Sequence, residues 1–146
     1  MPQLVAVDLG LRVGVAAFEQ PGELLWAMTQ HLSKRKQMER LAWAVFRRCG
    51  AVRHVVVEGD PRLGVIWERL AQREGASYLC VSAELWRPAM LLERERRSGS
   101  QAKRVAERMA NALSRGPDKL SHDAAEAVLL GLWACAQVQW MGDGTT

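Results

Sequence analysis

The stretch VAVDLGLRVGVAAF, residues 5–18, decides the fold. Its first part lies in a short apolar run, Leu4–Asp8, which is rich in valine and is typical of a buried strand. A second apolar run, Val13–Glu19, follows almost at once. A Pro-Gly pair at 21–22 marks a turn, and Glu23–Gln30 fits a third strand. The three runs together predict an antiparallel meander.

Beyond this meander the chain alternates helices and strands. We expect Ser33 to cap a helix that Gly50 closes, and Pro88 to disturb a short helical turn. The order β-β-β-α-β-α-β-α-α predicts an α/β fold, a mixed five-stranded sheet with helices on both faces. The patterns predict helices over 34–49, 63–73, 100–113 and 121–139, strands over 54–58 and 78–81, and the helical turn over 84–90.

The length of 146 residues is that of one domain. Hydrophobic residues make up 49% and charged residues 25%, which are ordinary globular values and exclude a disordered tail, a collagen-like repeat and a coiled-coil rod. We expect a single domain over residues 1–140 and a frayed C-terminal tail over 141–146.

The charge and the cysteines indicate the binding partners and the cellular compartment of the protein. Lys and Arg number 20 against 16 Asp and Glu, a net charge of +4, which by itself indicates nucleic-acid binding only weakly. Cys49, Cys80 and Cys135 are widely spaced and fit free thiols in a reducing compartment. No leader pattern begins the chain, and the longest apolar run is about half a membrane span. We therefore expect a cytoplasmic protein with no membrane segment.

Four carboxylates fall at informative places. Asp8 ends the first strand and Glu58 ends the strand HVVVE, while Asp123 and Glu126 open the last long helix, three residues apart on one face. In an open α/β sheet, ligands bind beyond the carboxyl ends of the strands. If the first and fourth strands are parallel neighbours, Asp8 and Glu58 lie side by side there.

Clustered carboxylates repel one another unless a cation lies between them, and oxygen ligands favour hard cations such as Mg²⁺ or Mn²⁺. Two such ions, about 3.5–4 Å apart, are suited to phosphodiester hydrolysis. Each acid also has a structural interpretation. Asp8 can form a turn, and Glu58 can pair in a salt bridge or lie at an exposed strand end. Asp123 and Glu126 can be ordinary acids at a helix start.

The quoted motifs resemble those of the RuvC-type Holliday-junction resolvases, of the ribonuclease-H-like superfamily. Residues 5–18 resemble the first strand pair (apolar strand, Asp, x, Gly, x, Arg, then a Gly that starts the next strand). VVVEGD at 55–60 resembles the second acidic site, and GSQAKRV at 99–105 a segment that opens a helix. SHDAAEAVLLGLWA at 121–134 is similar to the closing motif. The length is closer to compact phage-encoded or divergent members.

The resemblance implies a crossover junction endodeoxyribonuclease that resolves Holliday junctions by symmetric, two-metal-ion cleavage. By position, Asp8, Glu58, Asp123 and Glu126 are the implied metal ligands, with His122 as an alternative in a neighbouring register. It also implies a homodimer. The sequence has no Walker A loop and no nucleotide fingerprint, so we expect no nucleotide cofactor. Basic residues that would bind DNA are Arg12, Arg94, Arg96, Arg97, Lys103, Arg104 and Arg108.

Two other functions stay open. The YqgF-type nucleases, which process ribosomal RNA precursors, share the opening motif but typically lack an acid at the end of the fourth strand, where this chain has Glu58. Residues 82–88 of this chain also do not match the motif that follows the next strand in those nucleases. A non-catalytic ribonuclease-H-like domain would bind nucleic acid only. Trp67 and Trp86 are candidates for an aromatic wedge at a junction, and Trp43 and Trp67 for dimer anchors, although each also fits a core residue.

Overall fold

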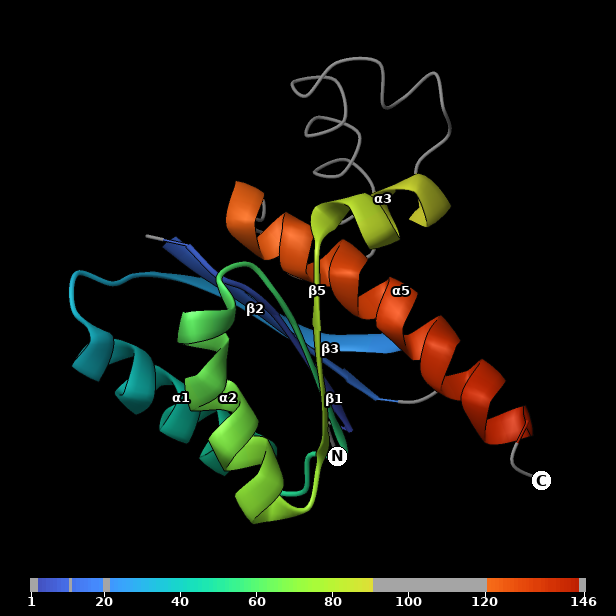
Figure 1. Cartoon of the computed structure of the whole chain (residues 1–146), viewed down its shortest axis with the longest axis horizontal. Helices are drawn as coiled ribbons and strands as arrows, with labels where there is room; N and C mark the ends of the chain where they lie inside the picture. The colour runs from blue at the N-terminus through green and yellow to red at the C-terminus, as the bar shows by residue number, and fades with distance from the viewer. Residues whose placement is uncertain (1–2, 11, 20–21, 91–120, 145–146) are drawn as a thin grey trace.

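The computed structural model describes residues 3–10, 12–19, 22–90 and 121–144, of which the side chains at 89, 90, 122 and 139–144 are left aside (Figure 1). The strands are β1 (Leu4–Asp8), β2 (Arg12–Glu19), β3 (Glu23–His31), β4 (His54–Glu58) and β5 (Ser77–Val81). The helices are α1 (Arg35–Cys49), α2 (Pro61–Glu74), α3 (Ala83–Met90) and α5 (His122–Gly144).

The five strands form one sheet in the order β3-β2-β1-β4-β5. The first three strands pair antiparallel, as the predicted meander requires, whereas β1 pairs parallel with β4 and β4 parallel with β5. The predicted mixed five-stranded sheet is therefore confirmed. So is the condition on which the acidic site depends, because β1 and β4 are parallel neighbours.

Helices cover both faces of the sheet, and the alternation of side chains along the strands separates two cores (Figure 1). Val5 and Val7 of β1 pack against α1 and α2. Ala6 of the same strand and Val56 of β4 lie in the opposite core with α5 and Trp86 of α3. A residue two positions beyond Ala6 or Val56 therefore lies on the α5 side.

The start of α1 differs from the prediction. Lys34, not Ser33, occupies the capping position. The Gln37 side chain carries the interaction instead, because its Oε1 accepts from the backbone N–H of Ser33 at 2.7 Å and of Lys34 at 3.2 Å. In a capping box, a glutamine at the third helical position reaches back in this way to the backbone N–H at the start of the helix.

The second helix begins two residues earlier than predicted, at Pro61. Asp60 caps it, since Oδ1 of Asp60 accepts from the backbone N–H of Arg62 at 2.9 Å. An Asp followed by a Pro is a recognised helix-start pattern, because proline needs no hydrogen bond in the first turn. The signal was therefore present in the sequence.

The last helix extends to Gly144, five residues beyond the predicted end at 139. The glycines at 142 and 144 each cost about 1 kcal/mol relative to alanine, which weakens a helix without ending it. The helical turn at 84–90 is a full helix, Ala83–Met90, that includes Pro88. The helix predicted over 100–113 lies outside the described residues, and the division at 140 stays a prediction.

Candidate active site

One row of paired residues crosses the sheet where β1 ends. Thr29 of β3 pairs with Gly14 of β2, and Gly14 pairs with Asp8. Asp8 pairs with Glu58 of β4, which in turn pairs with Val81 of β5. The two acids predicted to lie side by side therefore occupy adjacent positions in the middle of the sheet.

Both acids are on the α5 side of the sheet, by the alternation described above. Glu58 is 8% exposed and Asp8 is half-buried. The backbone joins the strands at the same place, because the Leu9 N–H donates to the Glu58 carbonyl at 2.9 Å. This end of the sheet therefore holds two carboxylates in a largely dry environment.

Gly14 lets the start of α5 reach this row. A Cβ at residue 14 would lie 2.0 Å from the carbonyl oxygen of Asp123, closer than any side chain tolerates. Ser121 fixes the approach from its side, because its hydroxyl accepts from the Ala124 N–H at 3.3 Å and hydrogen-bonds the hydroxyl of Thr29. The first turn of α5 is thus held over Gly14, the pairing partner of Asp8.

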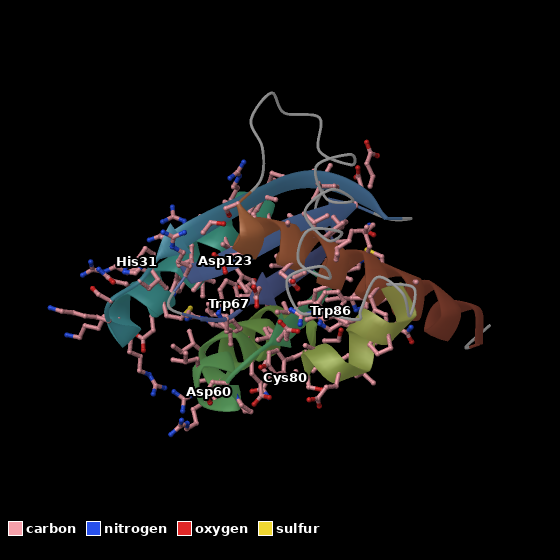
Figure 2. The ribbon with its side chains drawn as sticks, turned by 90° about the horizontal axis from the view of Figure 1, so that it is seen from above. His31, Asp60, Trp67, Cys80, Trp86 and Asp123 are labelled. Carbon is pink, nitrogen blue, oxygen red and sulfur yellow. The ribbon has the colours of Figure 1, made fainter. Side chains whose placement is uncertain are left out.

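This approach brings the other two acids to the same place. Asp123 lies at the first turn of α5 (Figure 2), and Glu126 is only 3% exposed one turn later. Burial, a hydrogen bond with Glu58, and the negative charges of Glu58, Glu126 and Asp123 raise the pKa of Asp8 to about 9. All four carboxylates that the sequence singled out are therefore within electrostatic reach of one another.

Two residues of α3 that the sequence reasoning did not select for this site complete it. The indole N–H of Trp86, a fully buried residue, donates to Oε1 of Glu58 at 2.7 Å. The guanidinium of Arg87 pairs with Oε1 of Glu126 at 3.0 Å. These are tertiary contacts of α3 with β4 and α5, and no spacing pattern in the sequence predicts them. Figure 2 labels Trp86 on α3.

The burial of two tryptophans corrects an expectation. Trp67 and Trp86 are both 0% exposed, so neither is available as an aromatic wedge. Trp67 packs in the core with α1 and α2, and its ring centroid lies 6.5 Å from that of Phe46. Trp43, in contrast, is 45% exposed. Of the two candidate dimer anchors, only Trp43 is on the surface.

The donor set fits a divalent cation by its chemistry. Four carboxylates supply only oxygen ligands, and burial together with the negative charges of its acidic neighbours raises the pKa of Asp8. The side chains are nevertheless not gathered around one point. Within the described ranges, no three His, Cys, Asp or Glu side chains are placed to hold an ion. Glu58 and Glu126 are instead turned towards Trp86 and Arg87.

Of the predicted DNA-binding residues, the structure describes one. Arg12 is exposed at the first position of β2. Because it is two residues from Gly14, it lies on the same face of the sheet, the α5 side, beyond the carboxylates. The side chain of His122 is not described. The remaining predicted residues lie outside the described part of the chain: Arg94, Arg96, Arg97, Lys103, Arg104 and Arg108.

Comparisons with known proteins identify the fold. The structure of Thermus thermophilus RuvC matches with a TM-score of 0.65 at 17% sequence identity, over 93% of this chain and 95% of that chain. The chain has the ribonuclease-H-like fold of RuvC. The fowlpox virus resolvase, solved with Holliday junction DNA, matches with a TM-score of 0.66 at 15% identity, over 92% of this chain and 97% of that one. No protein-family model and no curated protein matches.

The RuvC fold explains why the carboxylates meet. It places β1 beside β4 and lays the last helix across their ends, so acids far apart in sequence converge.

The three cysteines form no disulfide: Cys49 and Cys135 are buried and Cys80 is half-buried. No helix within the described ranges is both long and apolar enough to span a membrane.

Proposed function

We propose that the chain is a metal-dependent endonuclease that cuts branched DNA, and four-way junctions above all. The observation that carries the proposal is the convergence of Asp8, Glu58, Asp123 and Glu126 at one end of a RuvC-like sheet. Carboxylates are held together against their repulsion at a cost in stability, and a cation-dependent reaction gives a reason for the arrangement. The fowlpox resolvase, similar in fold, was solved with Holliday junction DNA.

In this proposal Asp8 has the central role. It pairs with both Gly14 and Glu58 in the sheet and interacts with all three other acids, so it would be the central ligand of the metal site. Glu58, Asp123 and Glu126 would complete the ligand sets. Two Mg²⁺ or Mn²⁺ ions, when bound, would activate the attacking water and stabilise the departing 3′-oxygen. No covalent intermediate with the chain is needed.

Basic residues would bind the phosphates of the DNA. Arg12 lies on the surface on the carboxylate side of the sheet, where its guanidinium can fork to a phosphate next to the scissile bond. The basic residues between positions 94 and 108, Lys103 among them, would extend this track along the DNA.

A homodimer would match the near two-fold symmetry of a four-way junction, with one site for each of two opposed strands. The exposed Trp43 of α1 is our candidate anchor. It lines a hollow of about 460 Å³ on α1 and a smaller one of about 180 Å³ that reaches α2. The guanidinium of Arg73 lies 5.3 Å from the centre of its ring.

Two alternatives compete with this proposal. A YqgF-type nuclease that processes ribosomal RNA precursors would share the fold and Asp8, but Glu58 at the end of β4 favours the resolvase. A domain that only binds nucleic acid would have no use for a buried, repelling cluster, and the raised pKa of Asp8 counts against it.

The test is cleavage of a labelled synthetic four-way junction beside linear duplex, flap and structured RNA, in Mg²⁺, in Mn²⁺ and in EDTA. We expect paired symmetric nicks on the junction that are absent in EDTA and with Asp8→Asn. Asp60→Asn is the matched control, because Asp60 is a half-buried helix cap two residues after Glu58 whose carboxylate pairs with Arg62 and not with the acids. Cutting of RNA alone would assign the chain to the rival nucleases. Tight junction binding without cutting in any metal would make it a binder.

A further inference from the structure

Arg87 pairs with the most buried acid of the site. Its Nη2 lies 3.0 Å from Oε1 of Glu126, and the Arg87 side chain is 34% exposed whereas that of Glu126 is 3% exposed. The guanidinium carbon also lies 5.6 Å from the centre of the Trp86 ring. The arginine therefore reaches from the surface, along an aromatic ring, into the carboxylate cluster.

This contact provides positive charge where the cluster needs it. An ionised carboxylate with so little exposure is costly to bury unless an opposite charge compensates it. The negative charge of Glu126 also reaches Asp8 and contributes to its raised pKa. Arg87 thus does, at one carboxylate, what a bound cation would do for the whole cluster.

We propose that Arg87 is a built-in counter-cation that competes with the divalent ion for Glu126. The proposal rests on the metal site of the proposed function. The Arg87 guanidinium and the metal ion would bind the same carboxylate, that of Glu126. Ion binding would then require Glu126 to turn from Arg87 towards Asp8. Arg87 therefore stabilises the ion-free protein and weakens ion binding. The opposite role, in which Arg87 orients Glu126 for the ion, predicts the opposite change in affinity.

The experiment measures Mn²⁺ affinity of the full chain from the electron paramagnetic resonance signal of free Mn²⁺. Arg87→Gln should bind Mn²⁺ about two- to fivefold more tightly than the wild type, the scale of one partly exposed charge pair. Arg87→Lys keeps the charge and should retain the wild-type affinity. Arg35→Gln, which removes an exposed charge from α1 on the other side of the sheet, should change nothing.

Thermal unfolding in EDTA gives a second readout. Arg87→Gln should unfold at a lower temperature than the wild type, and Mn²⁺ should raise its midpoint more than that of the wild type. If the Gln variant does not fold, Arg87→Met, which keeps an apolar contact with Trp86, takes its place in both measurements.

The outcomes separate this proposal from the proposed function. Weaker Mn²⁺ binding by Arg87→Gln, restored in Arg87→Lys, would make Arg87 a positioning residue and overturn the competition. Unchanged affinity would overturn it as well, while leaving the metal site intact. Absence of Mn²⁺ binding in the wild type and in every variant would overturn both proposals. Binding by Arg87→Gln alone would support the competition in its strongest form.

Discussion

Asp8 and Glu58 are pairing partners at the ends of the parallel strands β1 and β4, and their carboxyl groups share a hydrogen bond. Parallel pairing forces this proximity, because partners in a sheet have side chains on the same face. Two carboxyl groups so close can share a hydrogen bond only if one of them carries the proton. The raised pKa of Asp8 follows from this relationship together with burial.

The first prediction concerns pH. The pKa of Asp8 rises from 3.8 to about 9 on folding, so the folded state holds one proton more than the unfolded state between these values. Stability therefore falls as the pH rises through this window. Asp8→Asn removes that loss and should raise the melting temperature in EDTA by about 3–6 °C at pH 8, with little change at pH 4.

Thermal unfolding across pH 3–9 checks this prediction. Asp60→Asn serves as a control of opposite sign, because the hydrogen bonds from Arg62 lower the pKa of Asp60. That variant should lose stability at pH 8 and not at pH 3. An Asp8→Asn variant whose advantage does not grow with pH would show that Asp8 is not buried against the other acids.

The second prediction concerns Gly14. Gly14→Ala would place a Cβ 2.0 Å from the Asp123 carbonyl, so the start of α5 must move away from β2. We expect a stability loss of about 1–3 kcal/mol and a loss of Mn²⁺ binding in the variant that remains folded. Urea unfolding and Mn²⁺ titration measure the two effects.

Gly131→Ala is the matched control for Gly14→Ala. Its Cβ would lie 2.0 Å from the Phe18 ring, a similar overlap further along the same helix and away from the acids. It should lose stability and keep Mn²⁺ affinity. Equal loss of Mn²⁺ binding in both variants would mean that α5 moves as a whole, and Gly14 would have no particular role at the site.

The third prediction compares two buried tryptophans. Trp86→Phe removes the hydrogen bond to Glu58 and leaves a buried carboxylate oxygen without its donor, at a cost of about 1.5–3 kcal/mol. Trp67→Phe makes the same change of ring, but the indole N–H of Trp67 has no hydrogen-bond partner among the described residues. Trp86→Phe should therefore be the more destabilising in urea unfolding. Equal losses would mean that the Trp86–Glu58 bond contributes nothing measurable.

The positions of Asp8 and Glu58 could be predicted from the sequence for a physical reason. Each ends a short valine-rich run, and such runs form interior strands whose ends define the ligand edge of an α/β sheet. Asp123 and Glu126 could be placed as one helix face from their spacing alone. The sequence left the parallel pairing of the first and fourth strands as a condition, and the structure shows that it holds.

The contacts of α3 could not be predicted in this way. Trp86 and Arg87 are neighbours in sequence yet engage acids on β4 and α5, which depends on where one short helix docks. The predicted cap of α1 was wrong for a related reason, since the Ser33 hydroxyl donates to Oε1 of Gln37 at 3.2 Å instead of accepting from the first helical turn. Local sequence patterns predict the helices and strands, whereas these contacts depend on how the helices and strands pack against one another.

The last prediction decides between two neighbouring residues, His122 and Asp123. Asp123 is half-buried, contributes to the raised pKa of Asp8, and has its carbonyl against Gly14, so its backbone position is fixed over the acidic row. We expect Asp123→Asn to abolish junction cleavage and to weaken Mn²⁺ binding at least tenfold, since one anionic ligand is lost. His122→Ala should retain most of both, because successive helical residues face about 100° apart.

Single-turnover cleavage and Mn²⁺ titration on the same preparations measure these two effects. Unfolding midpoints in EDTA serve as the control, because Asp123→Asn removes a repelling charge and should not lower stability. The reverse pattern, with cleavage lost in His122→Ala and kept in Asp123→Asn, would move the ligand set one residue earlier along α5. The helix would then have to turn by about a quarter of a rotation to bring residue 122 over Asp8. Residues 122 and 126 are four apart, so they would still share one face of α5.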